Sequence, residues 1–203
     1  MPILFSTPIE ALISYSSLKE AISFNQDFDF LEWTIKHRDI GIFGKERDEL
    51  ISETARQFGV DEDCVHIMGS ARYGFSPTPK LVNGKVAKFP GRPFSEDSDV
   101  DITIISTQLF DTIWQDIYDQ FPYFRKYNFR DFSRFSEFLY RGWMRADQIP
   151  LRHPWYRRWR EKSVAISDRA IGSKLEVSVA LFRNDYFMKR KLEGTIHTMM
   201  SEY

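Results

Sequence analysis

Cysteine is almost absent from this chain, because Cys64 is the only one among 203 residues. A single cysteine cannot form a disulfide within the chain, which is typical of proteins in a reducing compartment, so we expect a cytoplasmic protein. The sequence also has no apolar run long enough to cross a bilayer, and its first residues lack the basic and apolar regions of a signal peptide. We therefore expect no membrane partner.

Charge of one sign is not in excess either, because 28 Lys and Arg side chains accompany 29 Asp and Glu side chains. The net charge of the whole molecule therefore gives no indication of a nucleic-acid partner, although a local basic patch could still bind one. The sequence contains no P-loop, no protein-kinase signature and no Gly-x-Ser-x-Gly elbow. Cys64 and His66 alternate on a predicted strand, but no further ligand follows at zinc spacing.

The pattern of apolar residues predicts an α+β fold, in which helices flank a small mixed β-sheet. Short apolar or β-branched runs predict three strands, which we place at 64–68, 100–105 and 174–182. Helical patterns lie before, between and after these strands. We expect Pro122 to end the helix that begins at residue 106.

The length is sufficient for one domain with a hydrophobic core, so we predict a single domain over residues 1–203. Its expected parts are N-terminal helices at about 1–60, a core at about 60–122 and 172–183, and an aromatic and basic helical elaboration at about 124–170. Residues 71–96 contain repeated Gly and Pro and are predicted to form a loop.

Three aspartates precede or begin the second predicted strand. Asp97, Asp99 and Asp101 occupy alternate positions, so in an extended chain they share one face, while Val100 and Ile102 face the core. Neighbouring carboxylates on that face lie roughly 6.5–7 Å apart, because the rise is about 3.3 Å per residue. Oxygen ligands without His or Cys favour a hard cation, so we predict a Mg²⁺ (or Mn²⁺) site here.

A Gly-Ser step follows the first predicted strand. In "HIMGSARYG", Gly69 and Ser70 come where the strand gives way to a helical turn. Backbone N–H groups at such a turn can hold a phosphate, and a glycine lets the backbone approach it closely. Arg72 lies near enough in sequence to contact the same anion. The Gly-Ser step could thus bind a triphosphate, and the aspartates could bind its metal ion. Phosphoryl and nucleotidyl transfer require such a pair of sites.

At these residues the chain resembles the nucleotidyltransferase superfamily of the DNA polymerase β type. "MGSARYG" followed by "SDVDI" is similar to the Gly-Ser step and alternating aspartates of that family, over roughly residues 60 to 110. The resemblance implies a nucleotidyltransferase-like sheet and a magnesium-dependent transfer of NMP from ATP or another NTP, with release of pyrophosphate. It also implies that Gly69 and Ser70 bind phosphates and that Asp99 and Asp101 hold the metal and are catalytic.

The third carboxylate, which that family usually takes from a later strand, has two interpretations here. In "KLEVSVALF", Glu176 shares a face with Ser178 and Ala180, opposite Val177 and Val179. If this strand neighbours the aspartate strand, Glu176 completes the metal site or acts as a base toward the acceptor hydroxyl. Otherwise Glu176 is an exposed residue at the edge of the sheet, and catalysis itself comes into doubt.

An aromatic and basic segment also has two interpretations. It interleaves arginines with aromatic residues, namely Arg141, Arg145, Arg152, Arg157, Arg158 and Arg160 with Trp143, Trp155, Tyr156 and Trp159. Arginines contact phosphates and aromatic rings stack on unpaired bases, so the segment could bind nucleic acid or a nucleotide. The same pattern fits a helix whose tryptophans pack in the core and whose arginines pair with acidic side chains.

The sequence does not identify the acceptor of the transferred group. Small family members without a large second domain often belong to toxin–antitoxin or antiphage systems, so the resemblance implies a protein or RNA acceptor, including a partner protein from the same operon. Lys80, Lys85, Lys88 and Arg92 could contact phosphates or an acceptor, or could simply be solvated. Two other classes stay open: an inactive module that binds an NTP or a partner chain, and a nucleic-acid-binding subunit that uses the basic segment.

Overall fold

The computed structural model describes residues 46–82, 85–124, 129–150 and 153–200, and the helices expected before residue 46 lie outside these ranges. The helices are α3 (Glu46–Phe58), α4 (Gly69–Tyr73), α5 (Thr107–Phe124), α6 (Phe129–Tyr140), α7 (Pro154–Ile171) and α8 (Asp185–Met200). The strands are β1 (Val65–Met68), β2 (Lys80–Val82), β3 (Lys85–Lys88), β4 (Val100–Ile105), β5 (Trp143–Arg145) and β6 (Val177–Phe182). Short 3-10 turns lie at Glu62–Cys64 and Ala146–Gln148.

Four of these strands form one mixed sheet in the order β1-β4-β6-β5. Strand β4 pairs with β1 in antiparallel and with β6 in parallel orientation, and β5 pairs with β6 in antiparallel orientation. Strands β2 and β3 form a separate two-stranded sheet inside the segment that we predicted to be a loop. The predicted α+β class with a small mixed sheet is confirmed, and β5 is a strand that the sequence pattern did not reveal.

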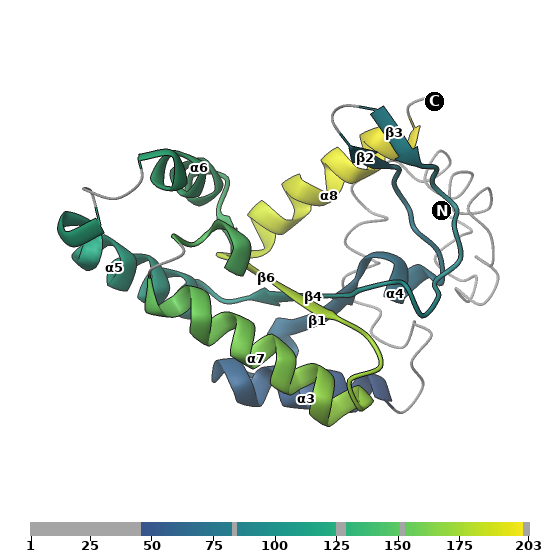
Figure 1. The fold of residues 1–203 in the computed structure, drawn as a ribbon, viewed down its shortest axis with the longest axis horizontal. Coiled ribbons are helices and arrows are strands. Elements are labelled where there is room, and N and C mark those ends of the chain that lie inside the picture. The colour runs from purple at the N-terminus through teal and green to yellow at the C-terminus, as the bar shows by residue number, and fades with distance from the viewer. Residues whose placement is uncertain (1–45, 83–84, 125–128, 151–152, 201–203) are drawn as a thin grey trace, which may run out of the picture.

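One face of the sheet packs against α3 and α7, which lie side by side (Figure 1). The β4 side chains Val100, Ile102 and Ile104 are buried, as the alternation predicted. Trp159 of α7 is fully buried and meets Phe58 of α3 edge-on, with ring centroids 5.4 Å apart. Each such apolar side chain contributes about 1.5–3 kcal/mol when it is removed from water, so this layer is the main hydrophobic core.

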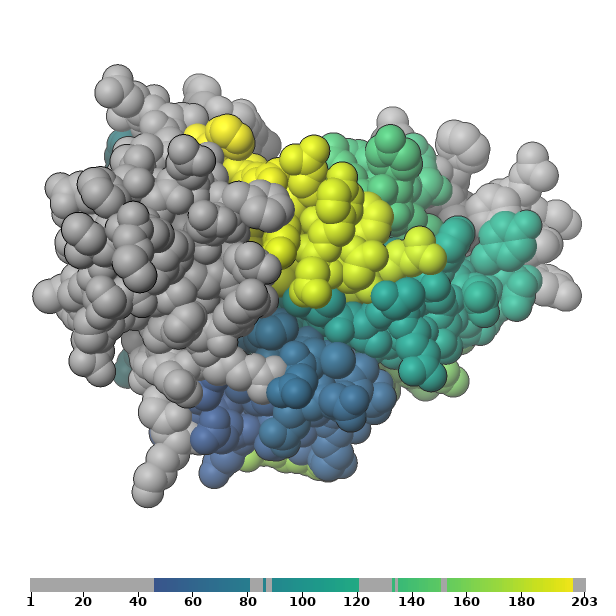
Figure 2. Space-filling view, turned by 180° about the vertical axis from the view of Figure 1, so that it is seen from behind, coloured from purple at the N-terminus to yellow at the C-terminus, as the bar shows by residue number. Residues whose placement is uncertain are grey.

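The opposite side of the sheet carries α8 and the β2–β3 pair (Figure 1). Seen from behind, α8 lies at the surface in yellow, between the blue segment that follows residue 46 and the teal and green segments (Figure 2). Helix α5 continues past Pro122 to Phe124, so the predicted end at Pro122 was wrong. A proline keeps a helical φ and removes only one N–H, so the last turn can form around it. Within the described ranges, no helix combines the length and apolar character needed to cross a bilayer.

Candidate functional site

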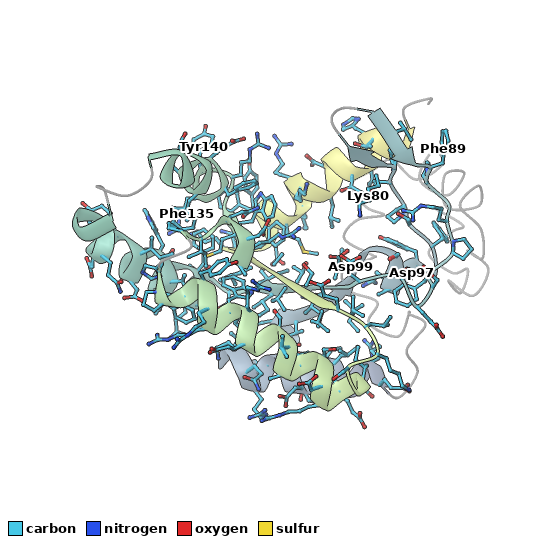
Figure 3. The ribbon with its side chains drawn as sticks, in the orientation of Figure 1. Lys80, Phe89, Asp97, Asp99, Phe135 and Tyr140 are labelled. Carbon is cyan, nitrogen blue, oxygen red and sulfur yellow. The ribbon has the colours of Figure 1, made fainter. Side chains whose placement is uncertain are left out.

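The Gly-Ser step and the three aspartates that the sequence singled out line one cavity of about 510 Å³. The cavity lies on the side of the sheet that carries α8, away from α3 and α7. Its polar and charged lining consists of Ser70, Tyr73, Ser76, Thr78, Lys80, Arg92, Asp97, Ser98, Asp99, Asp101, Thr103, Arg145, Ser178, Lys191 and Thr195. Figure 3 shows Asp97 and Asp99 beside α4, on the side of the sheet that faces Lys80 and α8. A cavity of this volume is within the usual range for small-molecule sites.

The three aspartates form the acidic part of the cavity. Asp101 is half-buried on β4, whereas Asp97 and Asp99 are exposed just before the strand. Burial in the cavity wall and the nearby negative charge of Asp99 raise the pKa of Asp101 to about 6, against a smaller opposing effect of Arg145. Within the part of the chain that the structure describes, none of the three carboxylates takes part in a hydrogen bond or an ion pair. The lining thus holds acceptor oxygens whose negative charges are not neutralised by a paired cation.

Gly69 brings the turn between β1 and α4 against this acidic group. Its φ is +62°, a left-handed conformation that L side chains rarely adopt. A Cβ placed on Gly69 would stand 2.6 Å from Asp101 Oδ2, a distance that real Cβ atoms do not show. Met68, just before it, is the register partner of Asp101 across the antiparallel pair. The glycine therefore allows the Gly-Ser turn and the aspartate strand to share one cavity, which Ser70 also lines.

Arg72 does not line the cavity, although we expected it near the same anion. It is only 4% exposed, and its Nη1 donates to the backbone oxygen of Ile67 at 3.4 Å. Burial lowers the pKa of Arg72. Successive helical residues are about 100° apart, so a residue two positions after Ser70 faces the other side of α4. Its role in nucleotide binding stays a prediction.

Strand β6 places Ser178, and not Glu176, opposite Asp101. Ser178 is the register partner of Asp101 and lines the cavity. Glu176 precedes β6, its side chain is exposed outside the cavity, and its backbone oxygen accepts from the Val100 N–H at 2.8 Å. No group of three or more His, Cys, Asp or Glu side chains is placed to hold a metal ion alone within the described ranges. Glu176 as a third metal ligand or base therefore stays a prediction.

The basic end of the cavity combines Arg145, which belongs to the aromatic and basic segment, with Lys191, which sequence reasoning missed. Arg145 comes from β5, and Lys191 comes from α8 with its Nζ 5.4 Å from the centre of the Trp143 ring. Helix α8 also lines the cavity with Met188 and Leu192. A lysine within an apolar stripe spaced three and four residues apart is a signal that could have drawn attention to Lys191.

The later part of the aromatic and basic segment forms α7, away from the cavity. Trp155 and Trp159 pack against the core, and Arg157 pairs with Glu161 at 3.3 Å. Arg158 lies over the Trp155 ring, and Arg160 donates to the Tyr156 hydroxyl at 3.1 Å. These contacts agree with a helix whose tryptophans are core residues. Nucleic-acid contact by these arginines stays a prediction.

No protein-family model, no curated protein and no solved structure matches this chain.

Proposed function

We propose that the cavity binds an NTP together with Mg²⁺ and transfers the NMP group to a protein or RNA acceptor. One observation carries this proposal: the Gly69–Ser70 turn and the unpaired carboxylates of Asp99 and Asp101 line the same cavity. A turn of this kind suits phosphate, and the carboxylates suit its counter-ion. The sheet order, with β4 between β1 and β6, is compatible with a nucleotidyltransferase-like fold.

The acidic lining is a suitable donor set for a divalent cation. Asp99 and Asp101 would hold it, because their oxygens have no partner among the described residues, and burial together with the charge of Asp99 raises the pKa of Asp101. Mg²⁺ is commonly bound by one or two carboxylates together with substrate phosphates. A pair of aspartates without a third carboxylate therefore agrees with a cation that arrives with the nucleotide. The bound cation would neutralise phosphate charge during transfer.

The transfer exchanges one bond at the α-phosphorus of the NTP. The oxygen of the acceptor hydroxyl bonds to the α-phosphorus, and the bond to the oxygen that bridges the α- and β-phosphates breaks. Pyrophosphate leaves with that electron pair, and the hydroxyl proton passes to solvent beside the exposed Asp97 and Asp99. The protein contributes mainly by positioning the NTP, with Ser70 as a hydroxyl donor at the turn. The acceptor could be a partner from the same operon in a toxin–antitoxin or antiphage system.

The test is incubation with each NTP, labelled on the α- or on the γ-phosphate, with Mg²⁺, alone and with cell lysate. We expect α-label and not γ-label to appear on a protein or RNA band. The band should disappear with Asp99→Asn combined with Asp101→Asn and should persist with Asp119→Asn, an exposed aspartate of α5 that does not line the cavity. Transfer of the γ-label instead would show phosphoryl transfer and contradict the proposal.

A second candidate function is NTP binding without turnover. Ser178 stands opposite Asp101, and Glu176, which the resemblance suggested as a third carboxylate, lies outside the cavity. In that case the labelled NTP would be recovered intact from the protein after incubation, with or without lysate. Binding would still depend on Asp99 and Asp101.

A further inference from the structure

The cavity floor has two ends of opposite charge on the sheet. Asp101 on β4 is the register partner of Ser178 on β6, and Arg145 on β5 is the partner of Ala180 on β6. All four residues line the cavity. Since neighbouring strands are about 4.8 Å apart, the carboxylate strand and the guanidinium strand are separated by about 10 Å. Between these two strands, β6 contributes the small side chains of Ser178 and Ala180, which leave space for a ligand.

The basic end is not neutralised by the acidic end. Arg145 pairs with Asp147 at 3.1 Å. Lys191 has no acidic partner within the described residues, and its Nζ lies over the Trp143 ring. Partial burial and the nearby guanidiniums of Arg141 and Arg145 lower the pKa of Lys191, so positive charges crowd this end. An anion bound there would be attracted by both cavity-lining cations.

We infer that Arg145 and Lys191 form an anion subsite that binds the β- and γ-phosphates of the NTP. This inference rests on the proposed function. A metal–triphosphate matches both ends of the floor, because its cation fits beside Asp99 and Asp101 while its terminal phosphates can reach the basic end. The flexible ammonium of Lys191 and the planar guanidinium of Arg145 both form strong charge-assisted hydrogen bonds with phosphate. The subsite would therefore discriminate triphosphates from monophosphates.

The experiment is calorimetric titration of the full chain with MgATP, with AMP and with inorganic tripolyphosphate. Lys191→Met keeps an aliphatic stem against the Trp143 ring and removes the charge, and Arg145→Gln removes the other charge. We expect each variant to bind MgATP and tripolyphosphate about ten-fold or more weakly, which is at least about 1.4 kcal/mol, while AMP affinity changes less than about two-fold. A thermal melt checks that each variant is folded.

Two further variants sharpen the test. Lys191→Arg keeps the charge and should retain most of the MgATP affinity. Arg190→Gln is the matched control, because Arg190 lies on the same helix, pairs with Glu193 at 2.7 Å and does not line the cavity. It should bind every ligand as the wild type does.

The possible results separate this inference from the proposed function. If MgATP affinity depends on Asp99 and Asp101 but not on Arg145 or Lys191, the subsite is overturned and the function stands. If AMP weakens as much as MgATP, the cations contact the nucleoside end, and the subsite is likewise overturned. A wild type that binds tripolyphosphate through Lys191 but binds no nucleotide would keep the subsite and overturn the function. Loss of RNA binding with tripolyphosphate affinity unchanged would assign the cations to a nucleic-acid surface and overturn the subsite.

Discussion

A Cβ on residue 69 would stand 2.6 Å from Asp101 Oδ2, so the Asp101 carboxylate keeps its position only while residue 69 is a glycine. We had expected the glycine to admit a phosphate. In the structure, Gly69 also allows α4 to begin in close contact with β4, the strand that carries Asp101. The Gly-Ser step and the aspartate strand, which are separate motifs in the sequence, are thus in direct steric contact in the fold.

Gly69→Ala should therefore abolish MgATP binding and destabilise the fold. The alanine would have a strained positive φ and would push against Asp101 Oδ2, for a total cost of about 2–4 kcal/mol. Gly59→Ala is the matched control, because Gly59 has φ +68° and a Cβ added there would meet no atom within 4 Å. It should cost only the backbone strain, about 1–2 kcal/mol. Urea unfolding compares the two variants, and equal losses would show that the contact with Asp101 is unimportant.

Asp101→Asn should stabilise the metal-free protein at neutral pH. The folded-state pKa of about 6 lies above the ordinary value of 3.8, so the native state binds the proton more readily than the unfolded state. The free energy of unfolding of the wild type should therefore fall as the pH rises from about 4 to about 6, by at most about 3 kcal/mol. In EDTA the variant should lack this fall.

Mg²⁺ should reverse that order of stability. A ligand that binds only the folded state raises its stability, so Mg²⁺ with ATP should raise the Tm of the wild type and leave Asp101→Asn unchanged. Thermal melts of the two proteins in EDTA and in MgATP give the change in Tm for each protein. An equal rise in Tm for the two proteins would place the cation elsewhere.

His153 should make the start of α7 sensitive to acid. Its Nδ1 accepts from the Trp155 N–H at 3.2 Å, and burial lowers the pKa of His153 although Asp116 opposes the shift and Arg158 adds to it. The unfolded chain then binds a proton first, so the free energy of unfolding should fall as the pH drops below about 6.5. His153→Asn keeps a capping acceptor without titrating in this range, and should show a flatter profile. Denaturant unfolding at pH 5 to 8 measures both slopes, and parallel profiles would contradict the assignment.

Replacing Arg157, Arg158 and Arg160 together by Gln should lower the Tm slightly and leave nucleic-acid affinity unchanged. The side chain of Arg157 is 83% exposed in its pair with Glu161, and such pairs contribute about 0–1 kcal/mol. Titrations with RNA at several salt concentrations provide the readout. If the arginines bind nucleic acid, the slope of log K against log salt should instead become shallower by about 0.7–0.9 for each lost phosphate contact.

The sequence pattern predicted those features of the site that depend only on residues close together in the chain. The alternation of Asp99 and Asp101 with Val100 and Ile102 follows from strand geometry alone, and the structure has it. Closeness in sequence did not place Arg72 beside Ser70, because a helix turns by about 200° between the two residues and Arg72 does not line the cavity.

Local patterns could not predict that Arg145 and Lys191 would share one cavity with the aspartates. Arg145 enters the cavity because β5, a strand of three residues, pairs with β6, and such a short run has no readable alternation. Lys191 enters it because α8 returns over the sheet. Both placements depend on contacts between segments that are distant in the sequence, and local patterns do not determine such contacts.

The cavity wall extends along the chain from Met68 to Ile196, so the site is a late product of synthesis. The Gly-Ser turn and the aspartates leave the ribosome well before α8, and domains form as their segments become available. A nascent chain that ends after β4 would already carry the whole recognisable motif, yet would lack Ser178 and the cations of β5 and α8. Any activity of this cavity therefore begins only after β5, β6 and α8 have packed against the rest of the fold.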